Sequence, residues 1–267
     1  MSRGALDHLS LPGELAGMVP EAVSYDIDGL DPGVHVGLPG PRLTMIFTFG
    51  EPLVVADDPV SAPRSYRAMV AGLSGRPSYV LHNGCQAGVQ LSLNPLSAAA
   101  LVGMPVGELS DRIVDLHHVW SGTDRLLDRL QSATNTPALA LALGEELHRR
   151  RRGVPGPASE VAVAWRLIQT SVGAVRIDEI ADRVGWSRRH LTNRFGEWFG
   201  VTPKLAAQLH RFHRAQRQVV SGRHDLATVA AQNGYADQAH MSREFTRMAG
   251  NPPRRWLRQD SMAASVA

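Results

Sequence analysis

Two stretches of the chain combine apolar side chains with hydrogen-bonding side chains at helical spacing. The first reads HLTNRFGEWFGVTP (residues 190–203) and the second HMSREFTRMAGNPP (residues 240–253). In each, the apolar positions form one stripe and leave polar side chains on the opposite face of the predicted helix. Arginine can pair bidentately with guanine and asparagine with adenine, while serine and threonine can bond several groups on base edges. These residues could therefore recognise the edges of DNA bases.

Helical geometry assigns a role to each polar side chain. At about 100° per residue, Arg189 and Asn193 project away from the apolar stripe of the first helix, and Arg243 does so in the second. The residues predicted to read bases are Arg189, Thr192, Asn193, Gln238, Ala239, Ser242 and Arg243. The residues predicted to contact phosphates or to flank the helices are Arg188, His190, Arg194, His240, Thr246 and Arg247.

Two of these assignments have a simpler alternative. Arg189 and Arg243 could contact phosphates alone, which would position the protein without reading sequence; we favour base reading because both point outward. For His190 and His240 we favour packing or phosphate contact over base reading. No residue can be assigned to an effector from the sequence.

A short helix and a glycine precede each stretch. Apolar side chains recur at i, i+3, i+4 and i+7 within residues 177–184, and Gly185 is a natural helix terminator. A second helix then runs to about residue 199 and is expected to bury Leu191, Phe195 and Trp198. Two helices about a tight glycine-containing turn are typical of a helix-turn-helix unit.

Residues 225–249 repeat this pattern, with Gly234 in the turn. Gly185 and Gly234 are 49 positions apart, whereas Phe195 and Phe245 are 50 apart. The second turn should therefore be one residue longer than the first.

A linking helix is predicted between the two units, over residues 203–221, with Arg211, Arg214 and Gln218 off its apolar face. At 1.5 Å per residue it would be about 28 Å long. Successive major-groove faces of B-DNA lie about 34 Å apart. One chain could thus place both second helices in adjacent major grooves, with DNA bending closing the remaining gap.

Charge is unevenly distributed along the 267 residues. Residues 1–157 carry 12 arginines against 16 acidic residues, a net charge of −4, whereas residues 158–267 carry 16 basic residues against 9 acidic ones, a net charge of +7. A basic domain beside a mildly acidic one is expected of a nucleic-acid binder. The run Arg149 to Arg152 could also touch phosphates, but we favour a solvated helix end that leads into the linker GVPGP.

The segment from Ile177 to Arg258 resembles the DNA-binding domain of the AraC/XylS family of bacterial transcription regulators. The resemblance is carried by IDEIADRVGWSRRHLTNRFGEWFGVTP and VAAQNGYADQAHMSREFTRMAGNPPRRWL and covers about a third of the chain. It implies sequence-specific binding to double-stranded DNA and control of transcription, with RNA polymerase as a partner if the protein is an activator. It also implies that the N-terminal domain binds a small-molecule effector, forms a homodimer, or both. That domain looks like one from a less studied subgroup, so the effector class stays open.

The N-terminal half shows shorter patterns. RLTMIFTFG, EPLVVADD, PSYVLHNG and QAGVQLSLNP read as strands bounded by turn residues. LSAAALVGM, LSDRIVDLHHVW, TDRLLDRLQSA and TPALALALGEELHRR keep helical periodicity. We expect a small α/β or β-barrel-like domain with a helical second half.

The predicted whole is a multidomain α+β protein. Residues 1–152 form the effector-sensing or dimerisation domain, 153–157 the linker and 158–260 an all-α domain with two helix-turn-helix units joined by the linking helix; residues 261–267 form a tail. No signal peptide or membrane span is predicted, which favours a cytoplasmic protein without a membrane partner.

Three groups of residues in the N-terminal half could carry catalytic chemistry, and each has a simpler interpretation. The adjacent His117 and His118, on a predicted helix, point about 100° apart and cannot chelate one metal together; one should be packed and the other solvated. Asp57 and Asp58 fit turn chemistry. Cys85 could be a reactive thiol beside His82, but we favour a small buried residue in a strand.

Two other functions compete with the control of transcription. AraC-like domains can be fused to an alkyl-accepting DNA repair domain, but that domain needs several cysteines around zinc, and the chain has one. An architectural protein that binds DNA without preference is the other rival. We predict no enzyme activity, no cofactor and no metal site.

Overall fold

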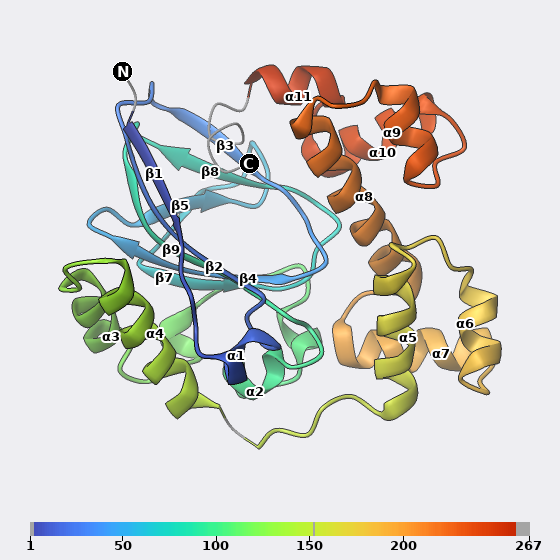
Figure 1. Ribbon diagram of the computed structural model, residues 1–267, viewed down its shortest axis with the longest axis horizontal. Helices are drawn as coiled ribbons and strands as arrows, with labels where there is room; N and C mark the ends of the chain where they lie inside the picture. The colour runs from blue at the N-terminus through green and yellow to red at the C-terminus, as the bar shows by residue number, and fades with distance from the viewer. Residues whose placement is uncertain (1–2, 152, 260–267) are drawn as a thin grey trace. The chain divides into compact units, whose positions relative to one another are not determined.

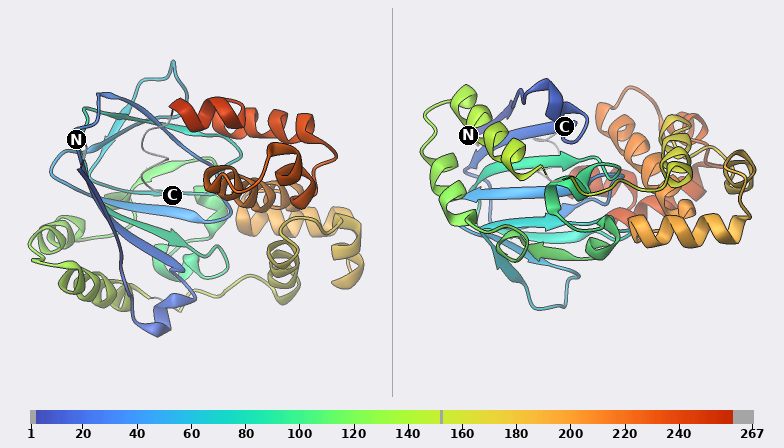
Figure 2. Two further views of the ribbon diagram at one scale, coloured as in Figure 1. Left: turned by 45° about the horizontal axis from the view of Figure 1, so that its top comes forward. Right: turned by 90° about the horizontal axis from the view of Figure 1, so that it is seen from below.

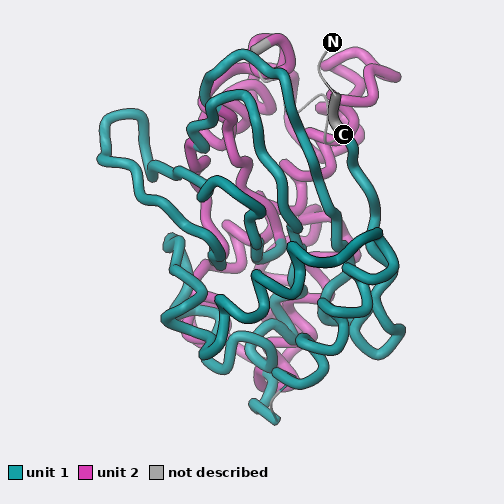
Figure 3. The backbone as a smooth tube through the Cα atoms, turned by 90° about the vertical axis from the view of Figure 1, so that its left-hand side faces the viewer, with its two compact units in different colours: residues 1–34, 42–72, 80–156 teal, residues 35–41, 73–79, 157–267 magenta. Residues whose placement is uncertain are grey.

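The computed structural model describes residues 3–151 and 153–259, which form two compact units (Figures 1 and 3). Unit 1 comprises residues 1–34, 42–72 and 80–156, and unit 2 comprises residues 35–41, 73–79 and 157–267. Two short segments of the first half, residues 35–41 and 73–79, thus group with the helical unit. The predicted tail, residues 261–267, lies outside the described residues.

A six-stranded antiparallel sheet is the centre of unit 1. Its strands, in spatial order, are β1 (Arg3–His8), β2 (Glu21–Asp28), β9 (Gln86–Leu93), β4 (Leu43–Phe49), β7 (Ala68–Ala71) and β10 (Ile113–Asp115). The central strand β4 is buried on both faces, which explains why its sequence is almost continuously apolar. The predicted strands within residues 42–50 and 86–95 are confirmed.

A four-stranded sheet faces it. Its order is β3 (Gly33–Gly37), β8 (Ser78–His82), β5 (Leu53–Ala56) and β6 (Arg64–Tyr66). Apolar side chains from the two sheets form a common core, namely Ile46, Leu53, Val55, Tyr66, Met69 and Val80. The predicted strands at residues 53–56 and 78–82 are therefore confirmed as one wall of this core.

Helices cover the other face of the six-stranded sheet (Figures 1 and 2). They are α1 (Gly13–Ala16), α2 (Ala98–Val102), α3 (Thr123–Gln131) and α4 (Thr136–Arg150), with 3₁₀ turns at Val106–Leu109 and Leu116–His118. The Phe47 ring lies 6.1 Å from that of Trp120, whose Nε1 donates to the carbonyl of Leu101.

The helix predicted over residues 109–120 is wrong. Ile113–Asp115 instead pairs with β7 at the edge of the sheet, with Ile113 opposite Ala71. The apolar residues of this segment fit a helical stripe equally well, but the free edge of β7 supplies backbone partners that a helix would not use. Asp115 then caps the 3₁₀ turn by accepting from the His117 amide.

Unit 2 is helical. Its helices are α5 (Ser159–Thr170), α6 (Ile177–Arg183), α7 (Arg188–Phe199), α8 (Pro203–Ser221), α9 (Leu226–Gln232), α10 (Gln238–Ala249) and α11 (Pro253–Gln259). Figure 1 shows α6 and α7 at one end of α8 and α9 to α11 at the other. In the described part of the chain, no helix is long and apolar enough to cross a bilayer.

Each end of α8 has its own aromatic core. Trp165 of α5 lies 5.8 Å from Phe195 and 4.4 Å from Phe199 between ring centroids. At the other end the Phe245 ring lies 5.1 Å from Phe212 and 5.4 Å from Trp256. Because α8 contributes to both cores, it fixes the two helix pairs in one rigid unit.

Candidate nucleic-acid interface

The first helix pair is α6 and α7. Residues 184–187 join them, and Gly185 has φ 72°, a left-handed conformation that a side chain would strain. Ser187 caps α7, since its hydroxyl accepts from the His190 amide at 3.2 Å. This polar cap and the buried Leu191 and Phe195 set which face of α7 is exposed.

The second pair, α9 and α10, repeats this construction with one difference. Residues 233–237 join the helices, so this turn is one residue longer, as predicted. Gly234 has φ 71°, and Asp237 caps α10 by accepting from the His240 amide at 2.6 Å. The additional residue in this turn does not change the roles of the capping side chain and of the glycine.

The predicted base-reading residues lie on the outer faces of α7 and α10. Arg189, Asn193, Gln238, Ala239 and Arg243 are exposed. Thr192 and Ser242 are half-buried, and the Thr192 hydroxyl donates to the Arg188 carbonyl within its helix.

The cations on these helices fall into two groups. Within the described residues, the side chains of Arg189 and Arg243 make no hydrogen bond or ion pair. Three flanking arginines are held by the protein: Arg188 pairs with Asp178 at 3.4 Å, Arg194 with Glu197 at 2.6 Å, and Arg247 donates to the Gly75 carbonyl at 3.3 Å. The outward pair is thus available to a ligand without breaking an internal bond.

Both histidines pack against an aromatic ring in the turn before them. His190 meets Trp186 edge-on at 4.6 Å, and His240 meets Tyr235 edge-on at 5.3 Å. The equivalent contacts at equivalent positions support the packing role that the sequence favoured for these side chains.

The sequence did not predict a buried ionic cluster behind α10, which we call the clamp: Arg211, Tyr235 and Glu244. The Glu244 side chain is 4% exposed, accepts from Arg211 at 3.1 Å and from the Tyr235 hydroxyl at 2.8 Å. The guanidinium also lies 4.8 Å above the Tyr235 ring. Burial, and then the charge of Glu244, raises the pKa of Tyr235, so this hydroxyl stays a donor.

A signal for the clamp was present in the sequence. Glu244 stands three residues after Met241 and four before Met248, which is a position of the buried stripe. A carboxylate there needs partners. Arg211, expected off the apolar face of α8, is one of them and is mostly buried.

Several other expectations need correction. Trp198 is only half-buried, and Phe199 takes its expected core position. Cys85 is exposed and precedes β9 instead of lying within a strand. Its thiol donates to Asp28 at 2.9 Å, and this bond raises the pKa of the thiol, which opposes nucleophilic reactivity.

The paired histidines also differ from expectation. Neither is buried, and His117 binds two carboxylates: Nδ1 lies 2.7 Å from Asp115 and Nε2 3.1 Å from Asp124. The turn role of Asp58 is confirmed, because it accepts from the amides of Val60 and Ser61.

The arginine run at the end of α4 is engaged within unit 1. Arg149 and Arg150 pair with the buried Glu146, and Arg151 pairs with Glu14 at 3.6 Å. Arg152 lies outside the described residues. These pairings support a helix end over a phosphate contact.

Comparison with known proteins identifies the helical region. A family described as "Helix-turn-helix domain" matches residues 180–259. The uncharacterized HTH-type transcriptional regulator YbfI of Bacillus subtilis (strain 168) is 28% identical over 123 residues, which are 43% of this chain and 44% of that protein. The HTH-type transcriptional regulator Rv1931c of Mycobacterium tuberculosis (strain ATCC 25618 / H37Rv) is 33% identical over 81 residues, or 30% and 31%. The chain therefore spans less than half the length of either relative.

The fold as a whole has solved counterparts. ToxT from Vibrio cholerae superposes with a TM-score of 0.56 at 12% identity, covering 90% of this chain and 98% of that one. A ToxT structure with a bound unsaturated fatty acid gives a TM-score of 0.53 at 11% identity, covering 90% and 95%. This likeness shows a shared two-domain fold. Residues 180–259 carry a helix-turn-helix domain, in agreement with the helix-turn-helix units expected from the sequence.

Proposed function

We propose that the protein is a regulator of transcription that reads two adjacent major-groove segments of double-stranded DNA. The carrying observation is the duplicated helix pair held at the two ends of the 19-residue helix α8. Its length of about 28 Å is close to one duplex turn of about 34 Å. The outer faces of α7 and α10 each present an exposed arginine with no internal partner among the described residues.

Roles within the interface follow from this geometry. Arg189, Asn193 and Arg243 read base edges, with Thr192, Gln238, Ala239 and Ser242 beside them. Arg188, Arg194, Thr246 and Arg247 contact phosphates at the edges of the two helices, while His190 and His240 hold the turns. Unit 1 tunes the occupancy of the DNA site through a bound effector or through contacts in a dimer. RNA polymerase is a partner if the protein activates transcription.

In-vitro selection of bound duplexes tests the central claim. We expect a site of two segments about one turn apart, bound about 10³-fold or more tighter than scrambled DNA at the same salt concentration. A ratio near one would refute specific reading and favour the architectural alternative. Footprinting at several salt concentrations would separate the phosphate contribution from the base contribution.

A further inference from the structure

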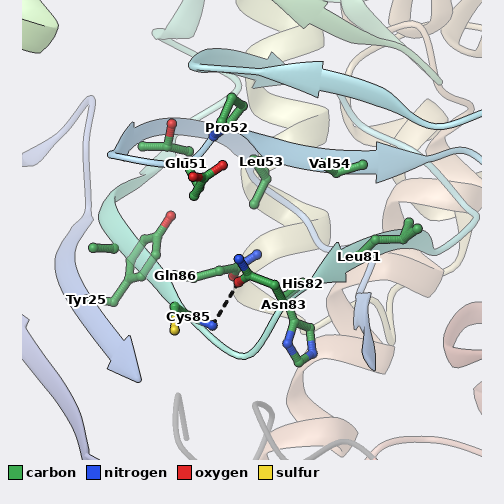
Figure 4. Close-up of a pocket in the computed structure, with 12 residues that line it drawn as sticks. Tyr25, Glu51, Pro52, Leu53, Val54, Leu81, His82, Asn83, Cys85 and Gln86 are labelled. Atoms are coloured by element: carbon green, nitrogen blue, oxygen red, sulfur yellow. Dashed lines mark hydrogen bonds between the residues drawn. The ribbon is translucent and has the colours of Figure 1, made fainter. Parts of the chain in front are cut away.

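An open pocket of about 290 Å³, which we call the cavity, lies in unit 1 at one end of the two facing sheets (Figure 4). Glu51, Pro52, Leu81, Asn83 and Cys85 are exposed at its rim. It is bounded by β2, by the segment from the end of β4 into β5, and by the turn from β8 into β9. All of its lining residues belong to unit 1. Its volume is near the lower end of the range for small-molecule sites.

The space around Tyr25 depends on a glycine in the neighbouring strand. A Cβ at Gly88 would lie 2.8 Å from the Tyr25 hydroxyl oxygen and 2.3 Å from the carbonyl oxygen of Phe47. Only glycine therefore lets the phenol ring lie across β9 at this point. Burial raises the pKa of Tyr25, so the hydroxyl stays protonated.

Polar groups gather at one end of the cavity. In Figure 4 the Tyr25 hydroxyl and the Glu51 carboxylate point toward one another. Gln86 lies on β9, the strand paired with β2, which carries Tyr25. Within the described residues, these three side chains make no hydrogen bond to another part of the protein. Their bonding capacity is thus available to a guest.

The rest of the lining decides which guest fits. Pro52, Leu53, Val54 and Leu81 form an apolar wall, and Leu81 is exposed although it is apolar. None of the twelve described lining residues is an arginine or a lysine. His82 is the one histidine among them. The Glu51 carboxylate repels an anion and attracts a cation.

We propose that this cavity binds a small primary amine in its ammonium form, with a compact hydrocarbon group against the apolar wall. The ammonium donates to the Glu51 carboxylate, the Tyr25 hydroxyl oxygen and the Gln86 amide oxygen. The ligand would be the effector of the regulator, and in that respect this inference rests on the proposed function. Its charge is opposite to that of a fatty acid, so the fold shared with ToxT would serve a different ligand class.

Three probes with one hydrocarbon skeleton test the charge preference: cyclohexylmethylamine, cyclohexylmethanol and cyclohexanecarboxylate. Binding to the full chain is measured at pH 7 by calorimetry and by thermal shift, without DNA. We expect the amine to bind at least about tenfold more tightly than the alcohol, since a hydrogen bond to a charged group is stronger than a neutral one. The carboxylate should not bind. Equal binding of the carboxylate, or no binding of the amine, would overturn the proposal.

Variants locate the site. Glu51→Gln keeps the shape of the side chain and should remove the preference for the amine over the alcohol. Tyr25→Phe should weaken the amine less, and Asp128→Asn, an exposed acid on α3, should leave binding unchanged. An unchanged preference in Glu51→Gln, at an unaltered unfolding temperature, would contradict the assignment. If the amine binds but leaves DNA affinity unaltered, the site stands and the tuning role fails.

Discussion

Arg243 is the residue at which recognition of DNA bases can be tested most directly. It is exposed on α10 with no internal partner among the described residues, so Arg243→Ala should cost about 1–3 kcal/mol on the selected site and relax preference at one base pair. Binding measurements on the full set of single-base variants of the site check this. Equal weakening on every duplex would instead assign the residue to a phosphate.

Arg194 provides the matched comparison. It lies at the edge of α7, where Glu197 already holds it. Arg194→Ala should weaken all duplexes alike and lower the slope of log affinity against log salt by about one. A change in base preference in this variant would instead assign Arg194 to the residues that read bases.

His117 should make stability depend on pH. Its bond to Asp115, and a second one to Asp124, raise the pKa of His117 in the folded protein above its ordinary 6.5. The bonds therefore stabilise fully below pH 6.5, and this contribution is lost as pH rises through the folded pKa. Because these groups are partly exposed, the contribution is about 1 kcal/mol or less.

Urea unfolding of wild type and His117→Gln at several pH values measures that contribution. The stability difference should be largest near pH 5.5 and should shrink toward pH 8.5. His118→Gln, at the exposed neighbouring position, serves as control. A difference that grows with pH would reverse the assigned sign.

At the scale of elements, the clamp fixes the rotation of α10 against α8. Glu244→Ala leaves a mostly buried guanidinium without its partner and should destabilise the chain by about 3–5 kcal/mol. Tyr235→Phe removes one hydrogen bond and should cost about 1 kcal/mol. Urea unfolding measures both.

A paired replacement separates stability from positioning. Glu244→Leu with Arg211→Met removes both charges and should recover most of the lost stability, since buried ion pairs are replaceable by apolar contacts. If the clamp sets the angle of α10, DNA affinity should remain reduced in this stable variant. Full recovery of DNA affinity would limit the clamp to a role in stability.

The helices of unit 2 were predictable because local signals agree there. Gly185 and Gly234 mark the turns, and the apolar stripes recur at helical spacing before and after each of them. The outer faces follow from that periodicity alone. The clamp could not be predicted from that periodicity, because it joins Arg211 to Glu244 across 33 positions. No local sequence pattern pairs two charges at that separation.

The strands β4, β5, β8 and β9 of unit 1 were predictable because apolar or alternating runs end there at turn residues. β4 is almost continuously apolar and β9 mixes buried with half-buried residues, whereas six of the eight residues of β2 are exposed or half-buried. β10 has three half-buried residues and forms because the backbone of β7 is available to pair with it. Such a strand depends on its partner more than on its own sequence. The cavity likewise needs segments distant in sequence, such as Tyr25 and Glu51.

At the scale of the whole molecule, the rigidity of α8 should dictate the spacing of the two DNA segments. Inserting five base pairs between them should lower affinity about 100-fold or more, to that of one helix pair alone. An insertion of ten base pairs restores the facing of the grooves but places them beyond the reach of a helix of about 28 Å, so it should not recover binding.

Gel-shift titration of these spaced duplexes, beside duplexes with a single segment, measures the effect. Recovery at ten base pairs would show that the two helix pairs are joined flexibly. Such a result would contradict the rigid role of α8 while leaving base reading by each helix pair intact.

The two helix pairs carry different residues on their outer faces, with Arg189 and Asn193 on one and Ala239 and Arg243 on the other. Because both belong to one chain, a single bound chain has no twofold axis, unlike a symmetric dimer on a palindrome. Each DNA site would therefore be asymmetric, with a defined direction along the duplex. Reversing it end for end within a promoter would turn the whole regulator around and present its opposite side to the transcription start.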